Sequence, residues 1–284
     1  LELHHEYPRN KATLALKQGR PTKYQAPEDY PLLQTRYTSS LDFNGQVAKS
    51  CIHCHQVREA ERRLLRDRKQ PLSDTLLHPY PMPDTIGLKL DPTKRASVLE
   101  VAAGSIAAKA GFKAGDEINK IDNQSVISIA DVQWMLERSG DSSPNQRWEV
   151  SRSGNNIQLI FDLPQGWRRA SPFAWRVTSW DLRRMGFGGM KLEDMTDEER
   201  RERGLSQTQM ALYARNVGQW GEHAVAKKAG VKKGDIIINF DGLTQRATEG
   251  DALSHAMKNR MRGDTLPITV LRGKQRHNFR IRMQ

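Results

Sequence analysis

The sequence predicts an α+β fold, in which a short helical segment precedes two copies of one small domain that combines strands with helices. Three observations support this prediction. A twelve-residue pattern occurs twice, as AAKAGFKAGDEI over residues 107–118 and as AKKAGVKKGDII over residues 226–237. Each twelve-residue stretch is followed by a pattern typical of a helix start and then by two apolar runs on either side of a glycine. Four prolines between residues 71 and 83 separate the helical segment from the first copy.

The composition is that of a polar but foldable protein. The chain has 284 residues, of which 37% are apolar and 27% are charged, and this length suffices for about two domains. A formal net charge of +12 suits an acidic partner, an anionic membrane surface or nucleic acid. The basic residues are spread along the whole chain, which favours an ordinary solvated surface. We therefore expect no nucleic-acid partner and no transmembrane segment, whereas peripheral membrane association stays open.

The first 83 residues divide into an arm and a helical segment. The chain begins at Leu1 and is interpreted as processed or truncated at this end. Residues 1–40 are rich in proline, tyrosine and charge, which predicts an extended or looped arm. Residues 41–83 are predicted to be helical up to the prolines, with a narrow apolar stripe beneath many arginines.

Both cysteines of the chain lie in the segment Cys51-Ile52-His53-Cys54-His55. The Cys-x-x-Cys-His order is typical of c-type haem attachment. On a helix, the two thiols and the last imidazole share one face, so the thiols could reach one porphyrin edge while the imidazole points at iron. By resemblance to small c-type cytochromes, Cys51 and Cys54 would form thioether bonds to haem c, and His55 would be the proximal iron ligand.

A sixth iron ligand would come from another histidine or methionine. Met82 is predicted first, because a thioether between Pro81 and Pro83 is held rigidly, and His78 is the alternative. Met82 could equally be a packing residue at the entry to the first domain. Two other interpretations of the cysteine motif remain open, namely a zinc or copper site and a dithiol that forms a disulfide.

Both copies of the repeat have the same predicted order of elements. A short helix ends at a glycine that can adopt a left-handed conformation cheaply, and a Gly-Asp turn then leads into an apolar strand. A second helix starts at a capping box, and a hairpin around a glycine closes the copy. The corresponding pairs are Gly111 and Gly230, Gly115 and Gly234, Ser128 and Thr248, Asp131 and Asp251, and Gly154 and Gly273.

These patterns, and above all the two twelve-residue stretches, resemble PDZ domains of the bacterial, HtrA-like type. The resemblance implies a small β-sandwich or barrel with two helices at residues 84–164 and again at residues 182–284, joined by a tryptophan-rich connector at 165–181. It also implies docking to protein partners through their C-terminal peptides. In that mode, free backbone N–H groups of a loop receive the carboxylate, and the peptide adds as a strand beside the loop.

The resemblance places the peptide-binding loops at residues 86–90 and 188–192 and the groove floor on the second helix of each copy. The predicted peptide-binding residues are Ile86, Gly87, Leu88, Val132 and Leu136 in the first domain and Gly189, Met190, Leu253 and Met257 in the second. The second domain departs from the pattern, because Gly188 replaces a bulky residue. A charged insertion over residues 194–204 could also cover its groove.

A wider resemblance covers nearly the whole chain. Its segments YPRN, CIHCHQV, YPMPDTIGL, GWRR, SWDLRRM and VGQWGEHAVAKKAG resemble the C-terminal part of predicted secreted planctomycete proteins that join a thioredoxin-like domain to PDZ domains. This resemblance implies a periplasmic or otherwise extracytoplasmic location. We expect no enzymatic activity, because the sequence has no Gly-x-Ser-x-Gly nucleophile motif of a hydrolase.

Two functional hypotheses follow from the sequence. The first is a haem c protein for electron transfer or redox sensing that docks partners through its PDZ domains. The second is a non-redox PDZ scaffold, or a subunit of a larger complex, whose cysteine motif binds zinc or copper or forms a disulfide.

Overall fold

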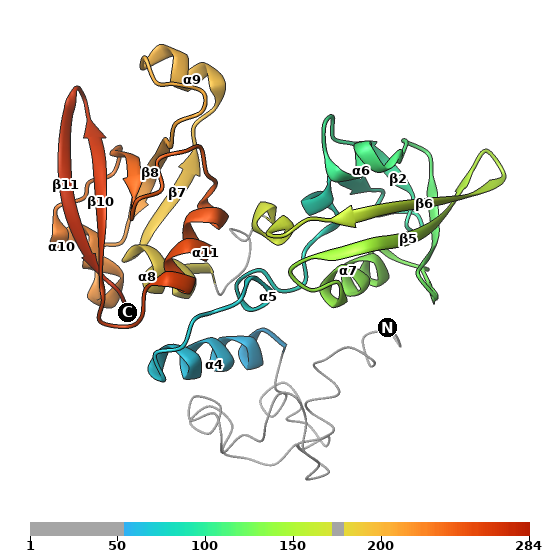
Figure 1. Cartoon of the computed structure of the whole chain (residues 1–284), viewed down its shortest axis with the longest axis horizontal. Coiled ribbons are helices and arrows are strands. Elements are labelled where there is room, and N and C mark those ends of the chain that lie inside the picture. Colours follow the sequence, from blue (N-terminus) through green and yellow to red (C-terminus); the bar gives the residue numbers. More distant parts are fainter. Residues whose placement is uncertain (1–53, 172–178) are drawn as a thin grey trace, which may run out of the picture. The chain divides into compact units, whose positions relative to one another are not determined.

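The computed structural model describes residues 54–171 and 179–284, and the statements below concern this part of the chain (Figure 1). Side chains are described from Glu61 onward. The predicted arm over residues 1–40 and the first motif cysteine, Cys51, lie outside the described residues. The described part combines helices with antiparallel sheets.

The chain divides into two compact units, Leu1–Leu72 and Ser73–Gln284. In the first unit, the described element is helix α4 (Cys54–Asp67), which carries Arg66 in its last turn. In the described part of the chain, no helix combines the length and the apolar character needed to cross a membrane. The second unit contains both copies of the repeat.

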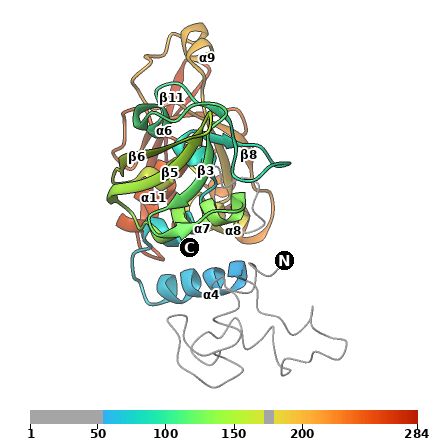
Figure 2. The same cartoon turned by 90° about the vertical axis from the view of Figure 1, so that its right-hand side faces the viewer.

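The first copy is built from two small sheets and the helices beside them. Strands β1 and β2 form an antiparallel pair, and the other four strands form a sheet in the order β4-β3-β5-β6. Figures 1 and 2 show α7 next to β5. The elements are η3 (Pro83–Ile86), β1 (Leu88–Leu90), β2 (Val98–Val101), α6 (Ile106–Ala110), β3 (Glu117–Ile121), β4 (Gln124–Ser125), α7 (Ile129–Arg138), β5 (Ser143–Arg152) and β6 (Asn155–Leu163).

Three aromatic rings lie at the centre of the first copy. Phe112 meets Trp148 edge-to-face with ring centroids 5.4 Å apart, and Phe161 lies within 5.7 Å of both rings. Edge-to-face contacts of this kind add to the stabilisation that comes from burying the rings. These side chains belong to one apolar cluster with β1 and α7, so the first copy has its own core.

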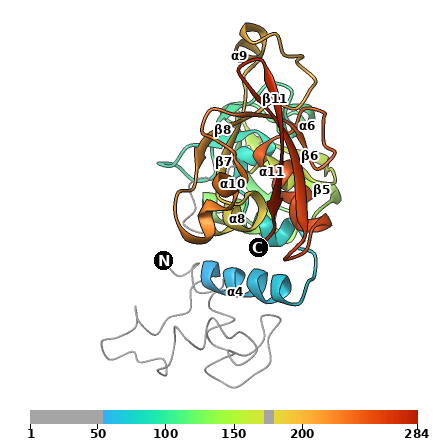
Figure 3. The same ribbon diagram turned by 90° about the vertical axis from the view of Figure 1, so that its left-hand side faces the viewer.

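The second copy has a single five-stranded sheet in the order β11-β10-β9-β8-β7. Figures 1 and 3 show helix α8 near α11 at one end of this sheet, and the two helices are in contact. The elements are α8 (Ser179–Phe187), β7 (Met190–Asp194), α9 (Asp197–Glu202), β8 (Leu212–Val217), η5 (Gly221–Ala224), α10 (Val225–Ala229), β9 (Ile236–Phe240), α11 (Glu249–Asn259), β10 (Thr265–Arg272) and β11 (Gln275–Arg282).

The caps predicted for both copies are confirmed. Gly111 ends α6 at a φ of 89°, and Gly230 ends α10 at a φ of 109°, which is the left-handed region that favours glycine. The Asp131 carboxylate accepts the N–H of Ser128 at 2.9 Å, and the second copy has the same capping box at α11.

An ion pair between a half-buried arginine and a buried aspartate is repeated in the two copies. Arg152 donates from Nε and Nη2 to the two carboxylate oxygens of Asp116 at 2.7 and 2.8 Å. Arg272 holds Asp235 in the same way, with both distances at 2.7 Å. Each arginine also donates to the carbonyl of the glycine that ends the short helix. The Gly-Asp turn of the repeat is therefore tied to the last hairpin of its own copy.

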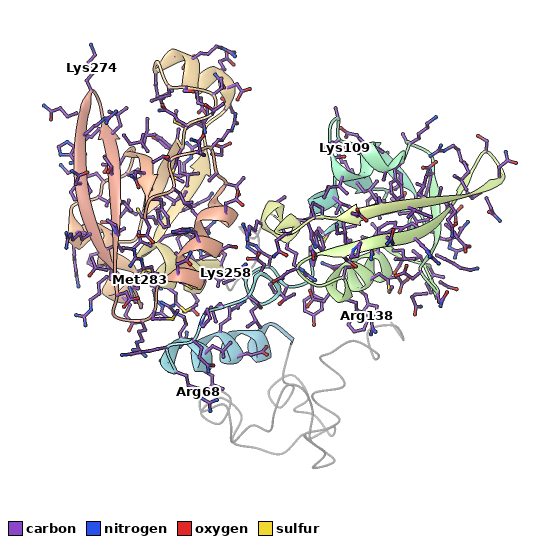
Figure 4. The ribbon with its side chains drawn as sticks, in the orientation of Figure 1. Arg68, Lys109, Arg138, Lys258, Lys274 and Met283 are labelled. Carbon is purple, nitrogen blue, oxygen red and sulfur yellow. The ribbon has the colours of Figure 1, made fainter. Side chains whose placement is uncertain are left out.

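Two short helices flank the first copy within the second unit. Helix α5 (Asp74–Leu77) precedes it, and η4 (Trp167–Ala170) follows it. The Asp74 carboxylate accepts bonds from Arg169 of η4 at 3.0 Å and from Lys258 of α11 at 2.8 Å. Figure 4 labels Lys258 on α11. These ion pairs join α5, η4 and α11.

Candidate functional site

Each copy has an edge strand beside its long helix. Among the described residues, β1 pairs with β2 alone, and β7 pairs with β8 alone. The short helix η3, which precedes β1, contacts α7, and β7 itself contacts α11. An edge strand carries unpaired backbone groups, so each copy offers a place where a further strand can add.

Hydrogen bonds around the two edge strands establish which residues correspond. Leu90 of β1 lies opposite Val98, and Leu192 of β7 lies opposite Ala214. The Val98 N–H donates to the Asp116 carbonyl, and the Ala214 N–H donates to the carbonyl of Asp235, both at 2.8 Å. Leu90 and Leu192 therefore occupy the same structural position.

The register also determines which backbone N–H groups point outward. The Gly87 carbonyl accepts the N–H of Ala102 at 2.9 Å, so Gly87 faces the neighbouring strand β2. Successive residues of a strand alternate in direction, which turns the N–H groups of Leu88 and Leu90 to the open edge. For the same reason, the N–H groups of Met190 and Leu192 face the open edge of β7.

In the second copy, the open edge already has an acceptor. The Leu192 N–H donates to Glu249 Oε1 at 2.9 Å, and Glu249 is the first residue of α11. Arg183 of α8 donates to the two oxygens of the same carboxylate at 2.8 and 2.9 Å. The Arg183 side chain is 1% exposed and that of Glu249 is 13% exposed, so water screens this pair little.

In the first copy, the corresponding position carries no acceptor. The first residue of α7 is Ile129, which follows the cap Ser128 as Glu249 follows the cap Thr248. Ile129 is half-buried and packs against the apolar cluster. No acceptor for the Leu90 N–H is found in the described part of the chain.

Helix α8 also packs on α11, the predicted groove helix of the second copy. A Cβ atom added to Gly186 would lie 2.6 Å from Leu253 Cδ1 and 3.4 Å from Met257 Cε, so the α8 backbone rests directly on α11. The N–H of Gly189, in the predicted carboxylate loop, already donates to the Arg183 carbonyl at 2.9 Å. In the first copy, the equivalent N–H of Gly87 donates to the Asp84 carbonyl of the preceding turn, also at 2.9 Å.

The predicted apolar groove residues lie in the cores of their copies. Met190, Leu253 and Met257 are fully buried in the second copy. Those of the first copy, Ile86, Leu88, Val132 and Leu136, are at most 1% exposed. Sequence reasoning did not assign Arg183, Glu249 or Ile129 to the site. Aligning the two capping boxes would have placed Ile129 and Glu249 at corresponding positions, directly after the helix caps.

The charged insertion at residues 194–204 lies at the far end of β7. Arg200 of α9 donates to Asp194 at 2.6 Å and to the Met195 carbonyl at 2.9 Å. Arg246 forms ion pairs with Asp194 and Asp197. These bonds hold the insertion against the end of β7, whereas α8 is the element that packs on α11.

The cysteine motif leads directly into α4, because this helix begins at Cys54. Cys51 lies outside the described residues, as do the side chains of Cys54 and His55. In the described part, no group of three or more His, Cys, Asp or Glu side chains is placed to hold a metal ion. The Sδ atom of Met82 accepts a bond from Gln133 at 3.2 Å. Haem, zinc and copper binding therefore remain predictions.

His78, the alternative ligand, belongs to a buried polar cluster. Its Nε2 atom lies 3.2 Å from Ser254 Oγ, and burial lowers the pKa of His78 to about 4. A serine, a histidine and the nearby Asp74 resemble the components of a hydrolase triad. All three are at most 1% exposed, and Asp74 is bonded to two cations, so substrate cannot enter and we assign the cluster a structural role.

Two segments of the chain match sequence profiles of the PDZ domain, namely residues 97–145 and residues 221–283. No curated protein sequence matches the chain. Among solved structures, the HtrA-type protease AlgWS227A with a decapeptide is similar over 47% of this chain and 38% of its own, at 23% identity and a TM-score of 0.31. AlgW with a tripeptide is similar over 58% of this chain and 51% of its own, at 16% identity and a TM-score of 0.29.

The HtrA3 PDZ domain bound to a phage-derived ligand is similar over 28% of this chain and 83% of its own, at 20% identity and a TM-score of 0.23. The chain thus spans 38% and 51% of the two protease chains. The peptides are ligands of those proteins, and the protease activity is a property of the AlgW chains.

Proposed function

We propose that this chain, which carries two PDZ domains, docks protein partners through the groove of its first domain. An extended segment of the partner would add as a strand beside β1. The observation that carries this proposal is the outward N–H of Leu90, which has no acceptor in the described part of the chain, whereas Leu192 at the same position is bonded to Glu249.

The surroundings of β1 indicate which segments would bind. Main-chain bonds from Leu88 and Leu90 would supply affinity without regard to sequence, and alternate side chains of the partner would meet α7. The first turn of α7 presents Ile129, which is half-buried, whereas Gln133 one turn later already donates to the Tyr80 carbonyl and to Met82 Sδ. We therefore expect a preference for apolar side chains. Because the Gly87 N–H is already bonded, the Leu88 N–H is the donor left for a terminal carboxylate.

Amide chemical shifts of the isotope-labelled chain test this proposal. The probes are decapeptides that end in Val, Leu, Phe or Ala, each compared with its C-terminal amide. We expect the Leu88 and Leu90 amides to shift, with weaker binding by the amidated forms. The absence of shifts on β1 at millimolar peptide would contradict strand addition. Equal binding of both forms would restrict the proposal to strand addition without carboxylate capture.

A second proposal concerns the cysteine motif. Haem c would be attached through Cys51 and Cys54 with His55 as the proximal ligand, which would make this an extracytoplasmic electron-transfer or redox-sensing protein. Its support is the Cys-x-x-Cys-His spacing together with the start of α4 at Cys54, which puts Cys54 and His55 in one helical turn. A haem would supply a one-electron centre, and Met82 or His78 remains the proposed sixth ligand.

An absorption spectrum distinguishes the haem proposal from its alternatives. Protein made with a secretion signal and haem-attachment machinery should show a reduced-minus-oxidised haem band, and Cys51→Ser/Cys54→Ser should abolish it. Zinc or copper found by elemental analysis without a haem band would favour a metal-binding scaffold. A mass lower by two hydrogens, which returns on reduction, would favour a disulfide.

A further inference from the structure

The two PDZ grooves differ in what meets their edge strands. In the first domain, Ile129 stands at the start of the groove helix, and the edge N–H of Leu90 has no acceptor among the described residues. In the second domain, Glu249 stands at that place and accepts the N–H of Leu192. A peptide that adds as a strand would offer a backbone carbonyl at this point, so the Glu249 carboxylate occupies the place of a peptide carbonyl.

Helix α8 occupies the loop end of the same groove. The Gly189 N–H would be a carboxylate donor in a peptide-binding loop, and here it donates to the Arg183 carbonyl. Gly186 lies against Leu253 and Met257, two of the residues predicted to contact a peptide side chain. The chain itself therefore makes the contacts to the strand edge and to the groove helix of the second copy, whereas the loop N–H is bonded within the chain in both copies, at Gly189 and at Gly87.

Arg183 links the two ends of this internal contact. Its carbonyl meets the loop, and its guanidinium fixes both oxygens of Glu249. A buried ion pair is a poor source of stability, because the cost of removing two charges from water offsets most of their attraction. The geometry of this pair is instead specific, since it orients Glu249 toward the edge of β7.

We propose that helix α8 is an internal ligand that closes the peptide groove of the second domain, with the Arg183–Glu249 pair as its latch. The proposal rests on the proposed function in one respect, namely that PDZ grooves of this chain take peptides by strand addition. The chain then binds one peptide, through its first domain, and release of the latch exposes a second site at Met190 and Leu192.

The latch is tested with Arg183→Met/Glu249→Leu, which replaces the pair by apolar residues of similar size and leaves no unpaired buried charge. The matched control is Glu222→Gln, which breaks the ion pair between Arg184 of the same helix and the 71% exposed Glu222 side chain and leaves the Arg184–Asp181 pair in place. We expect hydrogen exchange of the Leu192 amide to become at least about ten-fold faster in the latch variant, and to stay unchanged in the control.

Peptide binding is then measured on both variants with the decapeptides described above. The latch variant should gain a second site, seen as shifts of the Met190 and Leu192 amides, while the intact chain shows none there. A peptide that shifts Leu192 in the intact chain would overturn the proposal. It would equally be overturned by a folded latch variant in which Leu192 exchanges faster but no peptide binds, because α8 would then be a cover and not a ligand.

The site-resolved shifts separate the two proposals. If peptide causes no shifts at Leu88 and Leu90, docking by the first domain is refuted. The shifts at Met190 and Leu192 of the latch variant test the internal ligand independently of that result. Gly186→Leu provides a second variant, because its side chain must displace α8 from Leu253. It should expose the same two amides to peptide, and a folded Gly186→Leu chain that binds no peptide there would also overturn the proposal.

Discussion

The Glu249 carboxylate accepts the backbone N–H of Leu192 at 2.9 Å, and this contact distinguishes the second PDZ domain from the first. The N–H of Leu90 occupies the same position in the first domain, where Ile129 takes the place of Glu249 directly after the helix cap. Two domains with matching turns, caps and ion pairs thus differ at the atom where a bound peptide would make its main-chain bond.

Introducing a carboxylate into the first groove should close it. In Ile129→Glu, the new side chain can accept the Leu90 N–H as Glu249 accepts that of Leu192, so peptide affinity should fall at least about ten-fold, or 1.4 kcal/mol. Fluorescence anisotropy with a labelled decapeptide measures the change. Ile127→Glu is the control, because Ile127 is 50% exposed and precedes the helix cap. Equal losses in both variants would point to a nonspecific charge effect.

Two glycines with the same φ of 90° should respond differently to alanine. Gly189 lies against the His223 carbonyl, so an added Cβ would overlap it, whereas Gly242 has open space at that position. Gly242→Ala should cost about 1–2 kcal/mol from the left-handed backbone alone. Gly189→Ala should cost several kcal/mol more in urea unfolding. Similar costs would show that the loop moves away from His223 easily.

The repeated Arg–Asp pair should stabilise each domain separately. Asp116→Ala removes the acceptor of two Arg152 bonds and of the Lys113 N–H, and should cost roughly 3 kcal/mol. Asp235→Ala should have the same effect on the second domain, as measured by domain-resolved hydrogen exchange. Glu149→Gln breaks an exposed pair and should cost less than about 1 kcal/mol. A loss spread equally over both domains would contradict separate stabilisation.

Stability should fall between pH 6.5 and 4 because of His78. Burial lowers the pKa of its imidazole to about 4 in the folded chain, and the ordinary value is 6.5. The unfolded chain therefore binds the proton first as the pH falls, and up to about 3 kcal/mol of stability is lost across this window. In His78→Gln this part of the pH dependence should disappear from urea unfolding. An unchanged slope would assign the loss to other groups.

Asp74 should affect stability in a different pH range. Burial alone would raise the pKa of its carboxyl, but bonds and charges from Lys258, Ser254 and Arg169 lower it below its usual value. A carboxyl with a lowered pKa stabilises the fold above its ordinary pKa, and that stabilisation is lost as the pH falls below about 4. In Asp74→Asn, the free energy of unfolding should therefore depend less on pH below pH 4.

The sequence by itself determined the two PDZ domains, because their turns and caps are local. Gly111 and Gly230 end their helices in a conformation that glycine adopts cheaply, and each capping box needs two residues three apart. The motif around Cys51 is also local, and it remains a prediction about haem, metal or disulfide chemistry.

Only the tertiary structure decided that Glu249 meets the edge of β7. Glu249 after a helix cap reads as an ordinary favourable charge at a helix N-terminus. Glu249 and Leu192 are 57 positions apart in the sequence, and Glu249 and Arg183 are 66 positions apart. Such pairs depend on how β7, α8 and α11 pack together, and neither periodicity nor motif spacing encodes that packing.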